Sequence, residues 1–308
     1  MGKVAFLFAG QGAQYPGMGK ELYEISPAAK KVFDSAETIR PGTIEQCFNG
    51  DMNELSITKN TQPCLFTVDY ASAAALTEAG INAEASAGFS LGELAALGFC
   101  GILSFKEAFL LVLKRAELMQ SAAKRHPGAM TAVLKLDTED VRKLLNRYNS
   151  LFLVNLNCPF QNVVSGSTEQ LDEFEKKVLE AGGRYVRLKV SGAFHSPFME
   201  EASVALFDYA KSFEFKQANI PLYANATAAP YEGDLVKLMA DQVKSPVLWQ
   251  ASIERMIQDG YDRFVEVGAG KTLSGLVKKI GGAEAILNVE DKKSLANTVE
   301  ILKGESHA

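Results

Sequence analysis

A short strand that runs through a glycine-framed serine into a helix is the feature of this chain that most limits its fold. Residues 84–88 are predicted to form the strand and residues 91–97 the helix. Gly88, Ser90 and Gly92 have the G-x-S-x-G spacing of a nucleophile elbow, in which a sharp turn exposes the serine. The pattern predicts an α/β fold with Ser90 as a nucleophile. The alternative is that Ser90 only caps the helix, with its hydroxyl accepting a backbone N–H.

A serine hydroxyl needs a neighbouring base, most often histidine, to act as a nucleophile. The chain has three histidines. His307 lies in the C-terminal tail, and His126 precedes Pro127 at a predicted helix end, where a solvated or C-capping role is the simpler interpretation. His195 lies where the chain returns from a predicted inserted unit, so it can face the elbow across a cleft. Elimination favours His195 as the base, although a lone histidine is more often structural.

Arg115 is predicted to lie in the middle of an apolar helix face. The capping box Ser104-x-x-Glu107 begins this helix, which we expect to end near Lys124. At about 100° per residue, Arg115 projects from the apolar side. A buried guanidinium without a partner is costly, so it should meet a carboxylate. The pattern favours equally a structural Asp or Glu and a carboxylate brought by a ligand.

The order of predicted elements divides the chain into two parts. The segment between residues 129 and 190 has the order β-α-β-β-α-β, which is that of a ferredoxin-like unit, and α/β elements flank it on both sides. We therefore expect an α/β protein. It has an α/β-hydrolase-like large subdomain with a parallel sheet (1–126 and 192–308) and an inserted ferredoxin-like small subdomain (127–191). The predicted elements are strands 4–8, 129–135, 151–157, 162–166, 184–190, 222–224 and 264–267, and helices 63–79, 138–148, 168–181, 197–212 and 247–259.

Composition argues against several classes of function. The formal charge of −5 argues against nucleic acid or an anionic membrane as the main partner. The four cysteines form no CxxC pair and no cluster with histidine, which gives little support to a zinc site or disulfides and favours a cytoplasmic location. The longest apolar region, 94–113, contains Lys106 and Glu107, so we expect no membrane span. Residues 268–272 and 10–20 lack the full pattern of a phosphate-binding loop, and we expect no cofactor or metal.

Several segments together resemble one family, the malonyl-CoA:acyl carrier protein transacylases of type II fatty acid synthesis, with the related acyltransferase domains of polyketide synthases. The segments span nearly the whole chain in the expected order. They are Gly10–Gln14, Thr61–Pro63, Gly88–Glu93, Arg115 with Met119, Gly128–Met130, Val154–Asn157, Gly192–His195, Pro246–Trp249 and Glu266–Lys271. The resemblance implies a cleft between the two subdomains as the active site.

The resemblance also implies a role for individual residues. Malonyl-CoA would acylate Ser90 with His195 as base, and the phosphopantetheine thiol of acyl carrier protein would then collect the malonyl group. Arg115 would hold the malonyl carboxylate, and the backbone N–H groups of Gln11 and Leu91 would form the oxyanion hole. Further positions implied to bind substrate are Met119, Phe194, Gln62, Asn157 and Gln161. A backbone carbonyl in the stretch from Leu248 to Gln250 would orient the histidine.

Three residues depart from the family pattern. Phe89 stands where histidine is usual, Phe160 where glycine is usual, and Leu248 where a polar residue is common. The first two affect the shape of the acyl or pantetheine pocket and remove no catalytic group. If adjacent residues leave the elbow on opposite sides, Phe89 cannot occupy the place of the base.

Other functions remain compatible with the same residues. A thioester or ester hydrolase would use the same serine and histidine with water as the acceptor. A non-catalytic module that only docks a carrier protein is a further alternative, but such a module would not need both Ser90 and His195. Because carrier protein is acidic in this family, Lys278 and Lys279 are candidates for its docking surface, against the simpler interpretation of a solvated helix face.

Overall fold

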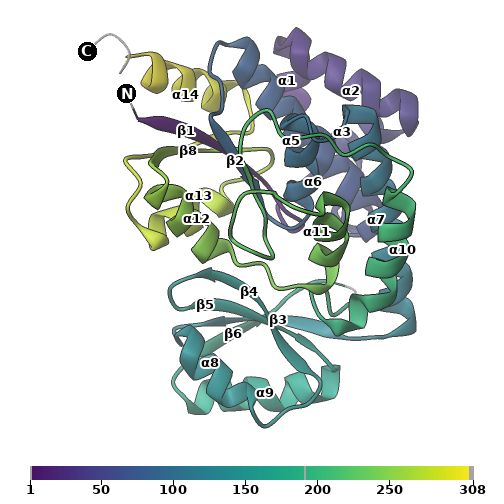
Figure 1. Ribbon diagram of the computed structural model, residues 1–308, viewed down its shortest axis with the longest axis vertical. Coiled ribbons are helices and arrows are strands. Elements are labelled where there is room, and N and C mark those ends of the chain that lie inside the picture. The colour runs from purple at the N-terminus through teal and green to yellow at the C-terminus, as the bar shows by residue number, and fades with distance from the viewer. Residues whose placement is uncertain (1, 191, 305–308) are drawn as a thin grey trace.

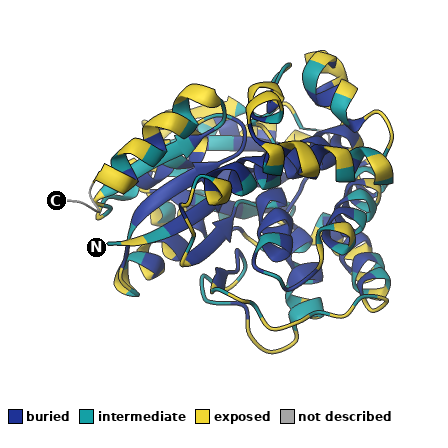
Figure 2. Cartoon of the chain, turned by 90° about the horizontal axis from the view of Figure 1, so that it is seen from above, coloured by how far each residue is buried: buried dark blue, intermediate teal, exposed yellow. Residues whose placement is uncertain are grey.

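The computed structural model describes residues 2–190 and 192–304, and it contains one parallel and one antiparallel sheet (Figure 1). The parallel sheet has the strand order β7-β2-β1-β8-β9, and each neighbouring pair is parallel. Its strands are β1 (Lys3–Phe8), β2 (Ala85–Gly88), β7 (Leu222–Tyr223), β8 (Tyr261–Val267) and β9 (Ala285–Val289). Figure 2 shows that these strands are mostly buried whereas the covering helices expose their outer faces. Such two-sided burial is typical of parallel sheets.

Helices cover both faces of the parallel sheet. They are α1 (Lys20–Ile25), α2 (Pro27–Ile39), α3 (Thr43–Asn49), α4 (Met52–Leu55), α5 (Thr58–Glu78), α6 (Leu91–Phe99), α7 (Phe105–Arg125), α10 (Glu200–Ala210), α11 (Leu235–Asp241), α12 (Trp249–Gln258), α13 (Thr272–Ile280) and α14 (Lys292–Gly304), with 3₁₀ turns η1 (Pro197–Met199) and η2 (Gln242–Lys244). Phe6 and Phe8 of β1 pack against Phe99 of α6, whereas Ala5 and Leu7 belong to the core that α12 and α13 complete. Because side chains alternate along β1, this strand contributes residues to the cores on both faces of the sheet.

The antiparallel sheet has the order β4-β5-β3-β6, with two helices on one face (Figure 1). Its elements are β3 (Ala129–Leu134), α8 (Thr138–Leu145), β4 (Leu151–Cys158), β5 (Gln161–Gly166), α9 (Thr168–Glu180) and β6 (Arg184–Arg187). Val133 and Val164 pack in a core with α8 and α9, whereas Met130 and Val163 belong to the core of the larger part. One face of this sheet is thus free to cover a site on the larger part.

The predicted fold class is confirmed, with differences in detail. The helix predicted at 63–79 begins five residues earlier and tolerates Pro63 inside it, and the strand predicted at 184–190 ends at Arg187. The patterns predicted no elements for α1 to α4, α11, β9 or α14. The subdomain boundaries at 126/127 and 191/192 stay a prediction; Ser191 and His307 lie outside the described residues. Within those residues, no helix is long and apolar enough to cross a membrane.

Candidate active site

Ser90 lies at the turn between β2 and α6 in a conformation that serine rarely adopts. Its φ is 53° and its ψ is −101°. The flanking glycines are required by close backbone approach, because a Cβ on Gly88 would lie 2.0 Å from the carbonyl carbon of Gly92. A Cβ on Gly92 would lie 2.2 Å from the carbonyl oxygen of Phe8. The sequence therefore specifies a strained elbow, and such strain is typical of functional sites.

The Ser90 hydroxyl faces His195, which is the arrangement of a nucleophile and its base. Ser90 Oγ lies 2.7 Å from His195 Nε2. Burial, together with the charge of Arg115, lowers the pKa of His195 to about 4. The imidazole is therefore neutral near pH 7 and can accept the hydroxyl proton. The alternative that Ser90 only caps α6 is not what the geometry shows, because its side chain makes no capping hydrogen bond.

Two backbone carbonyls orient the imidazole. His195 Nδ1 lies 3.0 Å from the carbonyl oxygen of Gln242 and 3.2 Å from that of Ser245. An N–H at Nδ1 leaves the Nε2 lone pair directed at Ser90. The prediction that a carbonyl from Leu248 to Gln250 has this role is wrong, although the kind of group is correct. The reason is that α12 begins at Trp249, so the Leu248 carbonyl accepts from Ser252 within the helix.

Arg115 extends from α7 to the same serine. Its two terminal nitrogens donate to the side-chain oxygens of Gln62 and Gln242, both at 2.9 Å, and one of them lies 3.1 Å from Ser90 Oγ. Among the described residues no carboxylate lies within 4.0 Å of its guanidinium, and its Nε has no hydrogen-bond partner. Burial lowers the pKa of Arg115 to about 10, so it stays charged. The sequence left open a structural carboxylate or one brought by a ligand. The structural candidate is the buried Glu93, which is not in contact with Arg115 but whose charge raises the pKa of Arg115.

A buried network behind the elbow was not predicted from the sequence. Asn225 Oδ1 accepts the backbone N–H of Ser90 at 2.7 Å, and its Nδ2 donates to the carbonyl of Gly88 at 2.6 Å. The Asn225 backbone N–H donates in turn to the carboxylate of Glu93, whose pKa burial raises to about 7. Gln242 Nε2 donates to the carbonyl of Ser90 at 2.6 Å. Asn225 and Gln242 thus hold the strained turn from two distant segments, and Glu93 fixes Asn225 in turn.

A cavity of about 240 Å³ opens above Ser90, between the parallel sheet and the antiparallel one. Its lining includes these residues predicted for the site: Gln11, Ser90, Arg115, Met119, Asn157, Gln161, Phe194 and His195. Gln62, Leu91, Leu248 and Gln250 are not part of its lining. Gln62 is fully buried and contacts Arg115 and Met119, so it lies behind the arginine. Leu248 and Gln250 line a separate surface depression with Thr138.

Phe89 stays clear of the base, as predicted. Its ring packs edge-on against Trp249 at 5.4 Å between centroids, and it lines the cavity. His195 reaches Ser90 from a different segment. The phenylalanine therefore makes one wall more apolar than a histidine would, without blocking the proton acceptor. His126 lies away from this site, where it is half exposed and 3.6 Å from Glu201.

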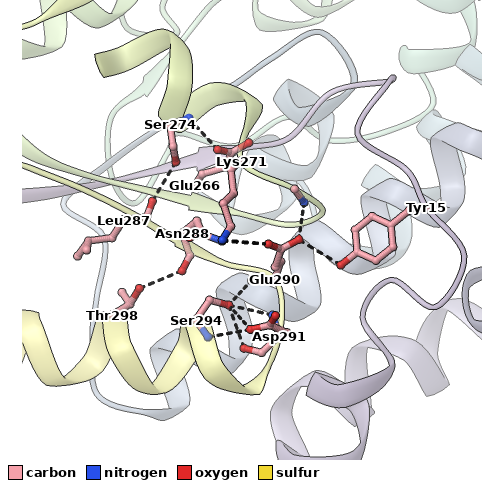
Figure 3. Close-up of polar contacts among 11 residues, drawn as sticks. Tyr15, Glu266, Lys271, Ser274, Leu287, Asn288, Glu290, Asp291, Ser294 and Thr298 are labelled. Carbon is pink, nitrogen blue, oxygen red and sulfur yellow. Dashed lines mark hydrogen bonds and ion pairs between the residues drawn. The ribbon is translucent and has the colours of Figure 1, made fainter. Parts of the chain in front are cut away.

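The loop that carries Gln11 is fastened at its far end. Figure 3 shows Glu290, just after β9, in contact with Tyr15 and Lys271. Its carboxylate accepts from the Tyr15 hydroxyl at 3.2 Å and from the backbone N–H of Gly270 at 3.0 Å. Burial and the Glu290 charge raise the pKa of Tyr15, so the phenol keeps its proton and donates. This contact holds the Gln11 loop against the loop before α13. Leu91 is the first residue of α6, where a backbone N–H has no partner within the helix.

Enzyme acylation should be independent of pH over the neutral range. A histidine base with the ordinary pKa of about 6.5 would be half protonated at that pH, and the acylation rate would be halved. With the pKa of His195 near 4, the single-turnover rate should be constant between about pH 5.5 and 8 and fall only at lower pH. Because this pKa is lower in the folded protein than in the unfolded one, stability should also decline as pH falls from about 6.5. A half-maximal rate near pH 6.5 would contradict this prediction.

An α/β fold with a strained serine, a neutral histidine and a buried arginine at one cavity defines a serine-dependent acyl-group enzyme. The acyl transferase domain pattern matches residues 5–295, and the chain belongs to this family of acyltransferases. No metal-binding group of three or more His, Cys, Asp or Glu occurs in the part of the chain described.

Named relatives cover the full length of the chain. It is 40% identical to the malonyl CoA-acyl carrier protein transacylase of Bacillus subtilis (strain 168), over 99% of both chains. The crystal structure of the malonyl CoA-acyl carrier protein transacylase of Clostridium perfringens superposes with a TM-score of 0.95 at 37% identity, over 99% of this chain and 98% of that one. A malonyl-transacylase solved with a type II polyketide synthase acyl-carrier protein superposes with a TM-score of 0.93 at 29% identity, over 97% and 99%.

Proposed function

We propose that this protein transfers a malonyl group from coenzyme A to the phosphopantetheine thiol of acyl carrier protein through a malonyl-Ser90 intermediate. The observation that carries the proposal is the buried Arg115 guanidinium, which lies 3.1 Å from Ser90 Oγ and contacts no carboxylate of the described chain. A malonyl thioester brings both groups that the site needs. Its carbonyl is attacked by Ser90, and its free carboxylate pairs with Arg115.

The two half-reactions use the same groups in opposite order. His195 Nε2 removes the Ser90 proton as Oγ attacks the thioester carbonyl, and the backbone N–H groups of Gln11 and Leu91 stabilise the oxyanion. Collapse of the tetrahedral intermediate releases coenzyme A, whose sulfur takes the proton from the imidazolium. The carrier thiol then gives its proton to His195, attacks the acyl-enzyme and restores Ser90.

The cavity walls fit a malonyl group on a pantetheine arm. Phe194 and Met119 line the cavity with apolar surface, and a bulky Phe194 disfavours an α-methyl group by about 1–3 kcal/mol. Asn155 and Asn157 also line it, and their buried side-chain oxygens have no hydrogen-bond partner among the described residues. A pantetheine arm carries amide N–H groups that can donate to such acceptors. Gln161 also lines the cavity, but its side-chain oxygen already accepts from Lys279 Nζ at 2.8 Å.

The alternative is a hydrolase that uses the same serine and histidine. We expect the malonyl-enzyme to persist in buffer and to be consumed rapidly when phosphopantetheinylated carrier protein is added. The measurement is intact mass of enzyme and carrier over time, together with free malonate. Apo carrier protein, which lacks the thiol, is the control and should leave the adduct unchanged. Release of malonate as fast as transfer to the holo carrier would favour the hydrolase.

The proposal also includes a docking surface for the carrier protein. Lys278 and Lys279 are exposed on α13, beside the cavity-lining Leu276, and they suit an acidic carrier protein. The carrier belongs to fatty acid or polyketide synthesis, and the expected location is the cytoplasm. The polyketide relative shows that the same fold also serves polyketide synthesis.

A further inference from the structure

The turn between β4 and β5 places an exposed phenylalanine in an unfavourable backbone conformation. Cys158 pairs with Gln161, so Pro159 and Phe160 are the central residues of the turn. Phe160 has a φ of 61° and is 58% exposed. Proline followed by a residue with positive φ matches a type II turn, whose second central position favours glycine or asparagine. Backbone strain and apolar exposure at one residue are better explained by binding than by folding.

This turn lies at the mouth of the active-site cavity. Asn157 and Gln161, on either side of it, line the cavity, as does Leu276 of α13 on the opposite wall. Lys279, one turn beyond Leu276 along α13, donates from Nζ to Gln161 Oε1 at 2.8 Å. This contact joins the two walls beside Phe160. The exposed ring therefore stands where a long substrate leaves the cavity.

Positive charge accompanies the aromatic ring. Lys279 is exposed, and no carboxylate of the described residues lies within 4.0 Å of its Nζ. Lys135 is also exposed, and its backbone N–H donates to the carbonyl of Phe160 at 2.9 Å. An aromatic face with nearby ammonium groups suits a purine that carries phosphates, because the base stacks on the ring and the phosphates attract the cations.

We propose that Phe160 and Lys279 form a binding subsite for the 3′-phosphoadenosine diphosphate end of coenzyme A. Adenine would stack on the Phe160 ring, and Lys279 would face the phosphates. The proposal rests on malonyl-CoA as the donor. A cavity of about 240 Å³ is smaller than the ~300–1,000 Å³ typical of sites that enclose a drug-sized ligand, so the nucleotide must lie outside it. The mouth beside Phe160 is the surface that continues the cavity in that direction.

The acylation half-reaction tests this subsite without any carrier protein. Malonyl-enzyme formation is measured by intact mass with two donors, malonyl-CoA and malonyl-S-N-acetylcysteamine, which lacks the nucleotide. For Phe160→Gly we expect the half-saturating concentration of malonyl-CoA to rise at least about fivefold, with the maximal rate unchanged. The constants for the short donor should not change. Phe160→Tyr keeps an aromatic face and should behave as wild type with both donors.

Stability and charge variants separate binding from folding. Because glycine adopts positive φ without strain, Phe160→Gly should melt at a higher temperature than wild type while binding malonyl-CoA less well. Lys279→Gln should also raise the half-saturating concentration of malonyl-CoA. Lys106→Gln, which removes an exposed lysine of α7 away from the cavity, is the control and should not.

The possible results separate a failure of the subsite proposal from a failure of the proposed function. If wild type forms an adduct with both donors and Phe160→Gly leaves the malonyl-CoA constants unchanged, the subsite is wrong and the function stands. Equal changes with both donors would also overturn the subsite, as would an effect confined to transfer onto the carrier protein. If wild type forms no adduct with either donor, the proposed function itself fails.

Discussion

Replacing Ser90 by alanine should abolish the malonyl-enzyme adduct. Wild-type protein incubated with malonyl-CoA should gain the mass of one malonyl group, and Ser90→Ala should show no gain. Transfer to carrier protein should fall by roughly 10⁴–10⁶-fold, because no other group takes over the covalent step. Among the described residues, Ser90 Oγ is the side-chain atom that contacts both His195 Nε2 and the Arg115 guanidinium. It is therefore the expected site of attack.

Loss of the adduct in Ser90→Ala should not result from unfolding. Ser90 makes no capping hydrogen bond, and its backbone is held by Asn225 and Gln242, so alanine should keep the elbow. Thermal melting and circular dichroism check this. Ser35→Ala, which removes an exposed hydroxyl bonded only to the Lys31 carbonyl, is the matched control and should acylate normally. An adduct that persists in Ser90→Ala would show that another residue is the nucleophile.

The elements that the sequence predicts well are those with a strong local rule. The elbow was predictable because Gly88 and Gly92 have no room for a side chain, a requirement that appears directly as residue identity. The βαββαβ order was predictable because strands and helices alternate with clear periods from Ala129 to Arg187. Arg115 stood out because a charge interrupted an apolar helix face. In each case the constraint lies within one short stretch of chain.

The parts that were missed depend on contacts between distant segments. Asn225 and Gln242 support Ser90 from 135 and 152 residues away, and an isolated asparagine or glutamine gives no pattern to notice. The carbonyls that orient His195 come from residues whose side chains are irrelevant to that role. Three of the helices between Lys20 and Leu55, namely α1, α3 and α4, have seven residues or fewer, so their periodicity is weak. The 13-residue α2 is different, because its amphipathic pattern and the Ser26 cap are local signals that were overlooked. The supports of Ser90 and His195 are therefore determined by which distant segments the fold brings together, not by the preferences of neighbouring residues.

Arg115 should be the residue that makes the enzyme prefer malonyl over acetyl donors. In Arg115→Ala we expect malonyl-CoA turnover to fall at least about a hundredfold more than acetyl-CoA turnover, because removing one partner of a buried ion pair typically costs 3–5 kcal/mol. Only the malonyl substrate brings the carboxylate that pairs with this guanidinium. The measurement is kcat/KM for both donors in wild type and variant.

The ratio of the two donors is what isolates the carboxylate contact. Arg115 also donates to Ser90 Oγ and lowers the pKa of His195, so its loss should change acetyl transfer as well. Such general effects act on both donors and cancel in the ratio. Arg115→Lys keeps the charge but loses the planar, two-pronged donor, and it should retain part of the preference. Because alanine leaves the oxygens of Gln62 and Gln242 without a donor, melting temperatures must be compared as well. Equal losses for malonyl-CoA and acetyl-CoA would mean that Arg115 only braces the elbow, and the basis for naming malonyl as the transferred group would be lost.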